Sequence, residues 1–570
     1  MASPRRWLRK RRIVLIGLLL SVIVALKYSI RMNHNELSRE LPDALLRLHH
    51  PHDPNVKLVS ALMNLTDPGV GGAGLFLDVR KLPKEEAEKF QRSLEQWEYS
   101  TYTSSLVPLQ RSLPDIRLKG CHSLYTDLNL PETSVVIIFH NEHWSVLLRT
   151  IHSIMNNTSP HLIKEIILVD DASTDEVLKG PLEEYVSRFS KVQLLRAESR
   201  QGLIRARMIG FEQSTAPVVV FMDAHCECFP GWLEPLVTRI AENQSIITTP
   251  NLHGINSKSF KIEDWGNGKN LEIPVLTFPN LFFAWTKMSE VEWKKRQRET
   301  DPVRSPAMVG CVIAVNRNWF KKLGMFDPGL EIWGGENTEL SVKTWLCGGG
   351  LEIIPCSNVA HMYHPHRPSK ESDIRYKRNI ARVSNVWLDK YKHFTDNYDG
   401  SIVDYGDISK RIALRDSLQC HQFEFYLTHV YPDQFIPGNG IYTGPIRNVE
   451  VCNHCLDPGG KRNGDSVNVL LYTCHGEGNQ RWDFTEHHEV RRGGLCLDSG
   501  YGSNVMMENC HGQRGNQEWE VVSLNGHVFL RSNGYCVGVT KNKSALVLEL
   551  CHNSALLQWT WKEHRKPLIS

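Results

Sequence analysis

The stretch Val218-Val219-Val220-Phe221-Met222-Asp223-Ala224-His225 joins an apolar run directly to an acid and an imidazole. Similar short apolar runs occupy residues 135–139 and 166–169, and helix-like stretches at 146–154 and 203–212 separate the runs. Strands that alternate with helices predict a parallel sheet flanked by helices. Side chains that follow such strands meet in a crevice at one edge of the sheet, where ligands bind. The pattern therefore predicts an α/β fold and the edge at which its chemistry lies.

Two polar clusters follow the predicted strands. Asp170 and Asp171 come after residues 166–169, and Asp223 and His225 come after residues 218–222. One carboxylate and one imidazole at a strand end can hold a divalent cation while leaving positions open for a ligand, which suits manganese bound to a diphosphate. A turn or a helix cap is the alternative interpretation of so short a motif.

A third cluster is the loop Trp333-Gly334-Gly335-Glu336-Asn337. An aromatic ring can cover the face of a sugar, while an acid and an amide hydrogen-bond its hydroxyl groups or those of an acceptor. An ordinary turn is the alternative here.

Length and charge limit the classes of protein. The 570 residues are enough for several domains, which excludes a peptide hormone or small scaffold. The net charge is +3, and six of the basic residues stand before residue 13, so the rest of the chain is close to −3. This charge argues against nucleic acid as a partner.

The N-terminus predicts a membrane anchor. Residues 13–30 are almost wholly apolar and follow the basic residues 5–12. The positive-inside rule places residues 1–12 in the cytoplasm as a tail and the remainder in the lumen, a type II topology. The short span favours the Golgi. A cleaved signal peptide is the alternative, but residues 27–31 make a poor cleavage site. We interpret residues 31–110 as a stem, although residues 84–99 have helical spacing.

The C-terminal region repeats itself three times at intervals of about 40 residues. A Pro- and Gly-rich linker over residues 432–446 precedes it. Each unit opens on a cysteine, closes on Cys-His and ends in Gln-x-Trp or a shortened form of it, which favours a threefold β structure. The cysteines of each unit are expected to pair, with free buried thiols as the alternative. The pairs are Cys455-Cys474, Cys496-Cys510 and Cys536-Cys551.

Together these motifs resemble one family. The succession His140-Asn141-Glu142, Asp170-Asp171, Gly202 to Arg207, Asp223-Ala224-His225 and Trp333 to Asn337 is similar to that of the polypeptide N-acetylgalactosaminyltransferases. The resemblance covers roughly residues 110–565. It implies a GT-A-type, Rossmann-like glycosyltransferase domain over residues 111–431 and an all-β ricin B-type trefoil lectin domain over residues 447–570.

The resemblance also implies a function. A protein of this family is a luminal, manganese-dependent Golgi enzyme that moves N-acetylgalactosamine (GalNAc) from UDP-GalNAc to Ser or Thr of a polypeptide. It retains the anomeric configuration and initiates mucin-type O-glycosylation. The expected partners are the donor, peptide or glycopeptide acceptors, and GalNAc-bearing glycans at the lectin domain.

Residue roles carry over by motif. His361 is the third metal ligand beside Asp223 and His225, and Trp333, Glu336 and Asn337 are the catalytic residues. The expected substrate contacts are His140, Asp171, Arg200, Gly310, His364 and Arg367. The expected lectin sugar sites are Asp457 with Asn479 and Asp498 with Asn516, and the third repeat is expected to be structural because Gly538 replaces the acid. A structural role for all three repeats is the alternative. Two further disulfides, Cys121-Cys356 and Cys347-Cys420, are implied.

The chain departs from the family pattern in two places. His364 stands where Arg is expected, Arg367 where His is expected and Ser369 where Tyr is expected, in a loop over the diphosphate. A mostly neutral imidazole binds phosphate less firmly than a guanidinium. Cys311 replaces a glycine and is expected to narrow the sugar pocket, with a tolerated small core residue as the alternative. Two alternatives follow: a weak or inactive regulatory protein that binds GalNAc-glycopeptides, or a transferase with another donor.

Overall fold

We describe a computed structural model of the chain, which covers residues 68–125, 129–268, 271–288, 290–363, 370–395, 403–459, 467–475, 480–500 and 505–563. Within these ranges no helix has both the length and the apolar character needed to cross a membrane. The predicted tail, membrane anchor and first half of the stem lie outside the described residues, as do His364, Arg367, Ser369 and Asn479.

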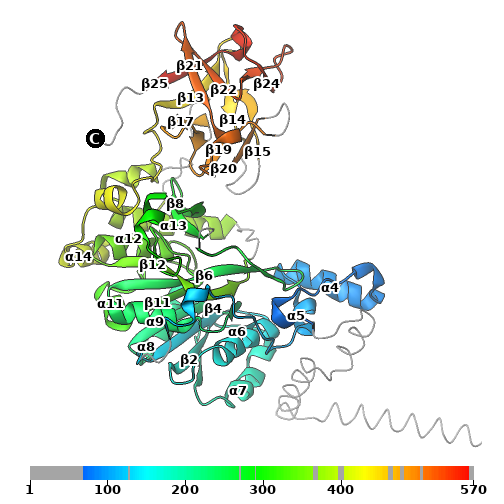
Figure 1. The fold of residues 1–570 in the computed structure, drawn as a ribbon, viewed down its shortest axis with the longest axis vertical. Helices are drawn as coiled ribbons and strands as arrows, with labels where there is room; N and C mark the ends of the chain where they lie inside the picture. Colours follow the sequence, from blue (N-terminus) through cyan, green and yellow to red (C-terminus); the bar gives the residue numbers. More distant parts are fainter. Residues whose placement is uncertain are drawn as a thin grey trace, which may run out of the picture.

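The catalytic unit, residues 70–430, is built on one mixed sheet with the strand order β10-β12-β6-β11-β4-β1-β2-β3 (Figure 1). β5 pairs with β12 at one end, and β7 pairs with β6. The strands are β1 (Thr133–Phe139), β2 (Ile163–Asp170), β3 (Val192–Arg196), β4 (Val218–Asp223), β5 (Cys226–Cys228), β6 (Ile246–Ile255), β7 (Ile262–Glu263), β10 (Val303–Arg304), β11 (Val312–Asn316) and β12 (Gly350–His361). A separate hairpin consists of β8 (Glu272–Thr277) and β9 (Phe282–Lys287).

Helices cover both faces of this sheet. Alternate residues of β1 point to opposite faces: Val135 and Ile137 pack with α6 (Trp144–Asn156), α7 (Gly180–Val186) and α9 (Leu233–Glu242). Val136 and Ile138 pack with α8 (Leu203–Gln213), α12 (Glu336–Leu346) and α13 (Lys370–Trp387). Further helices of the unit are α10 (Glu290–Lys295), α11 (Arg317–Lys322), α14 (Ser409–Ser417) and α15 (Phe423–Phe425).

The predicted parallel order holds for β3, β2, β1 and β4, which run parallel to one another. The prediction is wrong for β11, which runs antiparallel to β4 and β6. Antiparallel neighbours need no crossover helix, so the long excursion through the β8-β9 hairpin can return directly into the middle of the sheet. The sheet is therefore mixed.

The segment before residue 111 differs from the predicted stem. The helices α4 (Lys84–Trp97) and α5 (Thr101–Leu106) lead into a hydrophobic cluster in which Leu75 and Tyr99 pack with Val146 of α6 and Phe260 of the loop between β6 and β7. Apolar residues of this segment are therefore buried against the catalytic unit, which begins near residue 70 instead of residue 111.

The lectin unit, residues 442–563, is all β and has the predicted threefold repeat. Trp482, Trp519 and Trp559 are fully buried, and each indole N–H donates to a backbone carbonyl 22 to 26 residues earlier, at 2.7 to 3.0 Å. Its strands are β13 (Tyr442–Asn448), β14 (His454–Asp457), β15 (Val467–Asn468), β16 (Leu470–Thr473), β17 (Trp482–Phe484), β18 (Val490–Arg492), β19 (Leu495–Asp498), β20 (Met506–Asn509), β21 (Glu520–Leu524), β22 (His527–Ser532), β23 (Tyr535–Val539), β24 (Leu546–Leu550) and β25 (Trp559–Glu563).

The cysteines pair as expected. Each lectin repeat contains its internal disulfide, and the catalytic unit contains the two disulfides implied by the family resemblance. The other cysteines are free thiols: Cys226, Cys228 and Cys311 are buried, and Cys452 is exposed.

A buried ion pair ties the N-terminal segment to the sheet. Arg111 donates two hydrogen bonds of 2.7 Å to the carboxylate of Glu227 and a third, of 2.8 Å, to the carbonyl of Phe260. The Arg111 and Glu227 side chains are 0% and 4% exposed. Breaking such a pair leaves an uncompensated buried charge.

We predict that Arg111→Ala lowers the free energy of unfolding by about 3–5 kcal/mol, because Glu227 loses its partner in a low-dielectric environment. Urea denaturation followed by tryptophan fluorescence would measure it. Arg80→Ala, which breaks a similar pair with Asp78 at the surface, is the control and should leave the midpoint unchanged. Equal losses in the two variants would contradict the prediction.

Candidate active site

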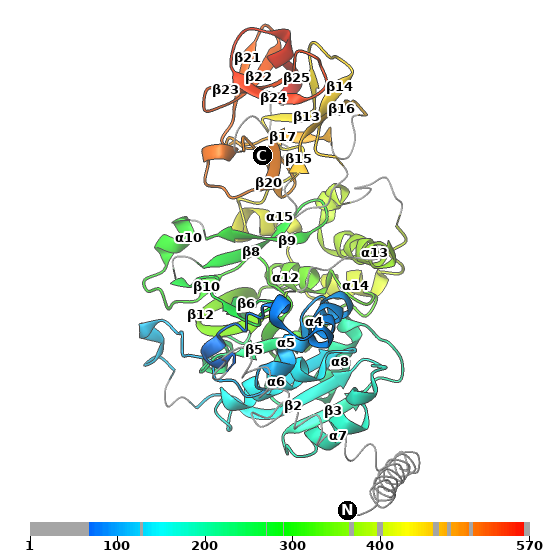
Figure 2. The same ribbon diagram turned by 90° about the vertical axis from the view of Figure 1, so that its right-hand side faces the viewer.

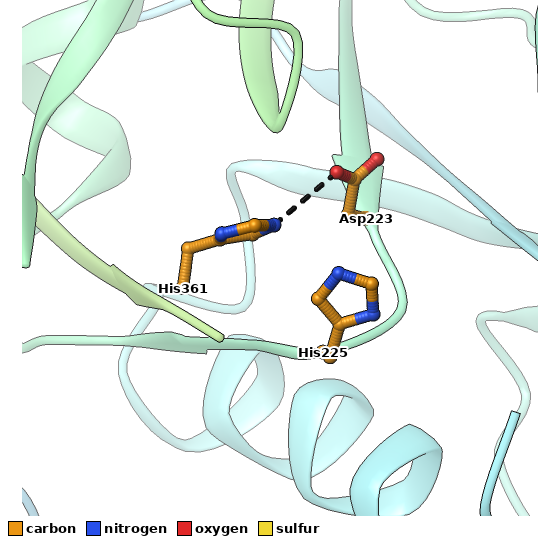
Figure 3. Close-up of side chains that lie close together, drawn as sticks. All are labelled: Asp223, His225 and His361. Carbon is orange, nitrogen blue, oxygen red and sulfur yellow. Dashed lines mark ion pairs between the residues drawn. The ribbon is translucent and has the colours of Figure 1, made fainter. Parts of the chain in front are cut away.

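Asp223, His225 and His361 meet at the edge of the sheet (Figure 3). One ligand atom of each lies within 4.8 Å of the others, and Nε2 of His361 lies 3.3 Å from the Asp223 carboxylate. The three predicted metal ligands are therefore brought together.

Strand pairing explains how His361 reaches this place. Asp223 ends β4, and His225 follows it in the turn before β5. β12 pairs with β5 so that His361 lies opposite Cys226, and the N–H of Met362 donates to the carbonyl of His225. A residue far away in sequence thus completes the site.

The electrostatics of Asp223 and His361 suit a metal. Burial lowers the pKa of His361, which favours the neutral, metal-binding imidazole. Burial opposes ionisation of Asp223, but the contact with His361 and the charge of Arg207 lower the pKa of its carboxyl to about 2. Neither ring nitrogen of His361 has a hydrogen-bond partner among the described residues, although both are buried. Two imidazoles, of which that of His361 is unsatisfied, and one carboxylate fit Mn²⁺.

Glu142 orients the second imidazole. Its carboxylate lies 2.9 Å from Nδ1 of His225, which leaves Nε2 as the ligand atom. Burial disfavours the charged imidazole, but the hydrogen bond and charge of Glu142, together with the charge of Asp223, outweigh burial and raise the pKa of His225. Glu142 belongs to a stretch that the sequence analysis quoted without assigning it this role.

The buried guanidinium of Arg207 joins the metal ligands to the catalytic loop. Its Nη2 donates to Asp223 at 3.0 Å and to the carbonyl of Gly310 at 2.6 Å. Its Nη1 lies 3.6 Å from the carboxylate of Glu336. Nε and Nη1 are buried and make no hydrogen bond to the described part of the chain. Arg207 therefore offers unused donors beside the site.

Glu336 and Asn337 begin α12, where the loop that carries Trp333 turns into the helix. Burial raises the pKa of Glu336. A Cβ on Gly310 would lie 3.4 to 3.6 Å from side-chain atoms of Arg207, Glu336 and Asn337, so the predicted donor-sugar position faces all three. Trp333 is 42% exposed, so its ring can pack against the face of a bound ligand.

Two residues on α13 hold this loop. Asn379 is fully buried and donates to the carbonyls of Glu331 and Gly334, both at 2.8 Å, and to that of Trp333 at 3.2 Å. Tyr376 places its ring 5.9 Å from that of Trp333. Sequence analysis missed Arg207, Asn379 and Tyr376 as site residues. Arg207 could have been found from the sequence as an arginine on the buried face of a predicted helix. Asn379 and Tyr376 contact residues far away in the sequence, so no local pattern marks them.

The predicted nucleotide residues lie together at the ends of β1 and β2. Nδ1 of His140 lies 2.7 Å from the carbonyl of Asp171. The Asp171 carboxylate accepts from the backbone N–H groups of Gln201 and Gly202, at 2.6 and 2.8 Å, and pairs with Arg200. Gly202 in turn pairs with Ile332, next to Trp333. The nucleotide residues are thereby connected to the catalytic loop.

Cys311 does not face the sugar pocket. Its side chain is buried in the core cluster on the α6 and α9 face, with Cys226 and Met222. Its carbonyl accepts from the N–H of Asp223 at 2.9 Å. The expected narrowing of the pocket at Cys311 is therefore wrong, because the side chain packs into this core cluster as a small core residue.

The predicted lectin sites differ among the repeats. Asp457 accepts from Gln480 at 2.8 Å, and Asp498 accepts from Asn516 at 2.6 Å. In the third repeat a Cβ on Gly538 would clash with the buried side chain of Leu557. That repeat is filled by an apolar side chain, in agreement with the expected structural role.

Comparisons with known proteins agree with this geometry. Residues 134–324 match the glycosyl transferase family 2 profile, residues 299–366 match the N-terminal domain of galactosyltransferase, and residues 442–561 match the ricin-type beta-trefoil lectin domain. A crystal structure of GalNAc-T7 with UDP, GalNAc and Mn²⁺ is similar, with a TM-score of 0.65 and 31% identity over 88% of this chain and 94% of that one.

A sheet with a metal site at its carboxyl edge, joined to a trefoil lectin unit, defines a glycosyltransferase with a lectin domain. The chain is 40% identical to polypeptide N-acetylgalactosaminyltransferase 5 of Caenorhabditis elegans over 90% of this chain and 82% of the relative. It is 39% identical to polypeptide N-acetylgalactosaminyltransferase 13 of Homo sapiens over 77% of this chain and 80% of the relative. It belongs to the polypeptide N-acetylgalactosaminyltransferase family.

We predict that Arg207→Lys lowers glycosyl transfer at least about tenfold, because an ammonium cannot reach Asp223 and Gly310 together as the guanidinium fork does. Initial rates with radiolabelled donor would measure it. Arg205→Lys, the same change on an exposed position of α8, is the control and should keep the wild-type rate. A wild-type rate in Arg207→Lys would refute the role given to this side chain.

Proposed function

We propose that this protein transfers GalNAc from UDP-GalNAc to Ser or Thr of polypeptides with retention of configuration, and so starts mucin-type O-glycosylation. The observation that carries the proposal is the single cluster in which Arg207 joins the triad Asp223, His225 and His361 to Glu336. Membership of the transferase family agrees with it.

The metal and the donor are held by separate groups. Asp223, His225 and His361 would hold Mn²⁺, which offsets the charge that grows on the leaving diphosphate. His140, Asp171 and Arg200 would bind the nucleotide. His364 and Arg367 would contact the diphosphate, with Arg367 supplying the permanent charge that His364 lacks.

The loop at the start of α12 would bind the sugar and the acceptor. Trp333 covers the sugar face, and Glu336 and Asn337 hydrogen-bond the sugar or the incoming hydroxyl. Gly310 lets the sugar approach the backbone, because a side chain there would point at Glu336 and Asn337. The acceptor hydroxyl attacks from the face that the diphosphate leaves, which retains the configuration.

A cavity of about 400 Å³ adjoins this place and would receive part of the acceptor peptide. It is lined by apolar and aromatic residues, among them Trp265, Trp285 and Leu252, and it reaches Val309, which precedes Gly310. Apolar walls with a few polar groups are typical of ligand pockets.

The lectin unit would bind GalNAc on glycopeptides through its first two repeats. Asp457 and Asp498 are the sugar-binding carboxylates, with Asn479 and Asn516 as amide partners. The hydrogen bonds from Gln480 and Asn516 hold the two carboxylates in place before a sugar arrives.

We further propose a location. Residues 13–30 would anchor the chain in the Golgi membrane as a single-pass type II protein, with both units in the lumen. The basic residues before that span favour this orientation. The five disulfides agree with an oxidising, luminal compartment.

A second function is a regulatory protein that binds GalNAc-glycopeptides and turns over slowly or not at all. The observation that favours it is the altered diphosphate loop with His364, Arg367 and Ser369. Transfer to a mixed library of naked and GalNAc-bearing peptides, followed by mass spectrometry, separates the two functions. Products establish the transferase, and binding without products establishes the regulator.

We predict that chelation with EDTA abolishes transfer and that added Mn²⁺ restores it. His361→Gln should lower both Mn²⁺ affinity and the transfer rate by about 10- to 100-fold or more, because it removes a ligand. Titration calorimetry with Mn²⁺ and rate measurements would check both. His253→Gln changes a buried histidine on the neighbouring strand β6 and should keep Mn²⁺ affinity. Unchanged Mn²⁺ affinity in His361→Gln would reject the metal site.

We predict that Asp457→Ala with Asp498→Ala removes binding of GalNAc-glycopeptides, while transfer to naked peptides continues. Surface plasmon resonance on immobilised glycopeptide would measure the loss. Gly538→Asp is the control: it should create no new site, because Leu557 occupies the space. Full affinity in the double variant would show that the sugar binds elsewhere.

A further inference from the structure

The turn of the β8-β9 hairpin lies between the lectin unit and the active site. Figure 2 shows β8 and β9 directly beneath the lectin unit, on the side of the catalytic unit that also carries α13. Residues 278–281 form the turn between the two strands. The turn contacts the lectin unit on one side and the residues that hold the catalytic loop on the other.

On the lectin side, the turn between β18 and β19 contacts this hairpin. Gly493 has φ +59°, and a Cβ there would lie 2.8 Å from the carbonyl oxygen of Phe278. A Cβ on Gly494 would lie 3.3 Å from Cγ2 of Thr277. The two backbones approach so closely that Gly493 leaves no room for a side chain.

The contact is held in place from both units. Arg491 donates to the carbonyl of Gly493 at 2.8 and 3.0 Å and lies over the ring of Phe435, 4.2 Å from its centre. Gln434, in the linker, donates to the carbonyl of Leu276 at 3.0 Å. Linker, lectin turn and hairpin therefore form one packed interface.

On the other side, the same hairpin turn contacts the residues that hold the catalytic loop. The hydroxyl of Tyr376 donates to the carbonyl of Asn280 at 3.0 Å. Thr338, next to Asn337, donates to the carbonyl of Leu281 at 3.3 Å. The Tyr376 ring lies 5.9 Å from that of Trp333 and occupies the space that a Cβ on Gly334 would need, 2.5 Å away.

We propose that the second lectin repeat braces the catalytic loop through the β8-β9 turn, with Tyr376 as the positioning residue. The lectin unit is then a structural part of the active site, and not only a tethered sugar-binding module. The turn at 493–494 immediately precedes β19, and β19 ends in Asp498. The brace and the second sugar site therefore lie at the two ends of one strand. The inference rests on the proposed function, because it concerns the loop that would bind sugar and acceptor.

The third repeat supplies a matched control for the test. In the second repeat, Arg491 pairs with Cys496 across the turn, and in the third, Arg531 pairs with Cys536 across residues Asn533 and Gly534. Asn533 has φ +51°, so an asparagine is accepted at the position that matches Gly493. Gly534 has φ +84° and nothing within 4 Å of an added Cβ.

The experiment compares Gly493→Asn with Gly534→Asn in the full chain. Both place asparagine at a left-handed position of a lectin turn, but only the first pushes against the hairpin. Hydrogen–deuterium exchange of residues 331–336 is the first readout, and kcat with a naked peptide at saturating UDP-GalNAc is the second. We expect Gly493→Asn to speed the exchange and lower kcat about fivefold, and Gly534→Asn to change neither. Glycopeptide affinity should be unchanged in both.

A second variant keeps the test independent of folding effects at position 493. Tyr376→Phe removes the hydroxyl donor alone and should also speed exchange of residues 331–336. Combined with Gly493→Asn it should add little, because both act on one contact. Wild-type exchange in Gly493→Asn, equal effects in Gly534→Asn, or fully additive effects would overturn the brace. A wild-type protein without transfer would reject the proposed function, whereas the exchange data would still decide the brace.

Discussion

The buried guanidinium of Arg207 is the point at which three distant segments of the catalytic unit meet. It contacts Asp223 at the end of β4, the carbonyl of Gly310 before β11, and Glu336 at the start of α12. A buried cation needs partners, so its hydrogen bonds to Asp223 and Gly310 and its ion pair with Glu336 limit how far these segments can move apart. The spacing between metal ligands and catalytic loop follows from that constraint.

The lectin unit depends on a different feature, a buried tryptophan that occurs once in each of the three repeats. Each repeat buries a tryptophan and satisfies its indole N–H with a backbone carbonyl of the same repeat. The three tryptophans share one core, while the surface of each repeat is free to vary. Leu557 fills the third repeat, whereas carboxylates remain in the first two. Fold and binding can therefore change separately.

The hairpin β8-β9 connects the lectin unit to the active site of the catalytic unit. Its turn is packed between Gly493 of the lectin unit and Tyr376 of the catalytic unit. Such a contact restricts the position of the lectin unit relative to the active site, in addition to the linker. The catalytic loop is thus supported by three separate parts of the chain: α13, the β8-β9 turn and the lectin unit.

The strands β1, β2 and β4, the helices α4, α6 and α8 and the metal ligands at β4 were predictable from local patterns, because apolar periodicity and a polar strand end are properties of neighbouring residues. The lectin repeat and its disulfides were equally readable, since spacing repeats along the chain. His361 and the pairs Cys121-Cys356 and Cys347-Cys420 could be expected only through the family resemblance. The antiparallel β11, the inward packing of Leu75 and Tyr99, and the direction of Cys311 could not be predicted.

The sequence by itself determined the class of each unit, the ligand types and their order along the chain. Only the tertiary structure decided which face Cys311 occupies, that Arg207 links Asp223 to Glu336, and that Tyr376 contacts the turn beneath Gly493. These contacts join residues far apart in the chain, and no local pattern encodes them. They depend on strand register and helix packing, which the whole core decides at once.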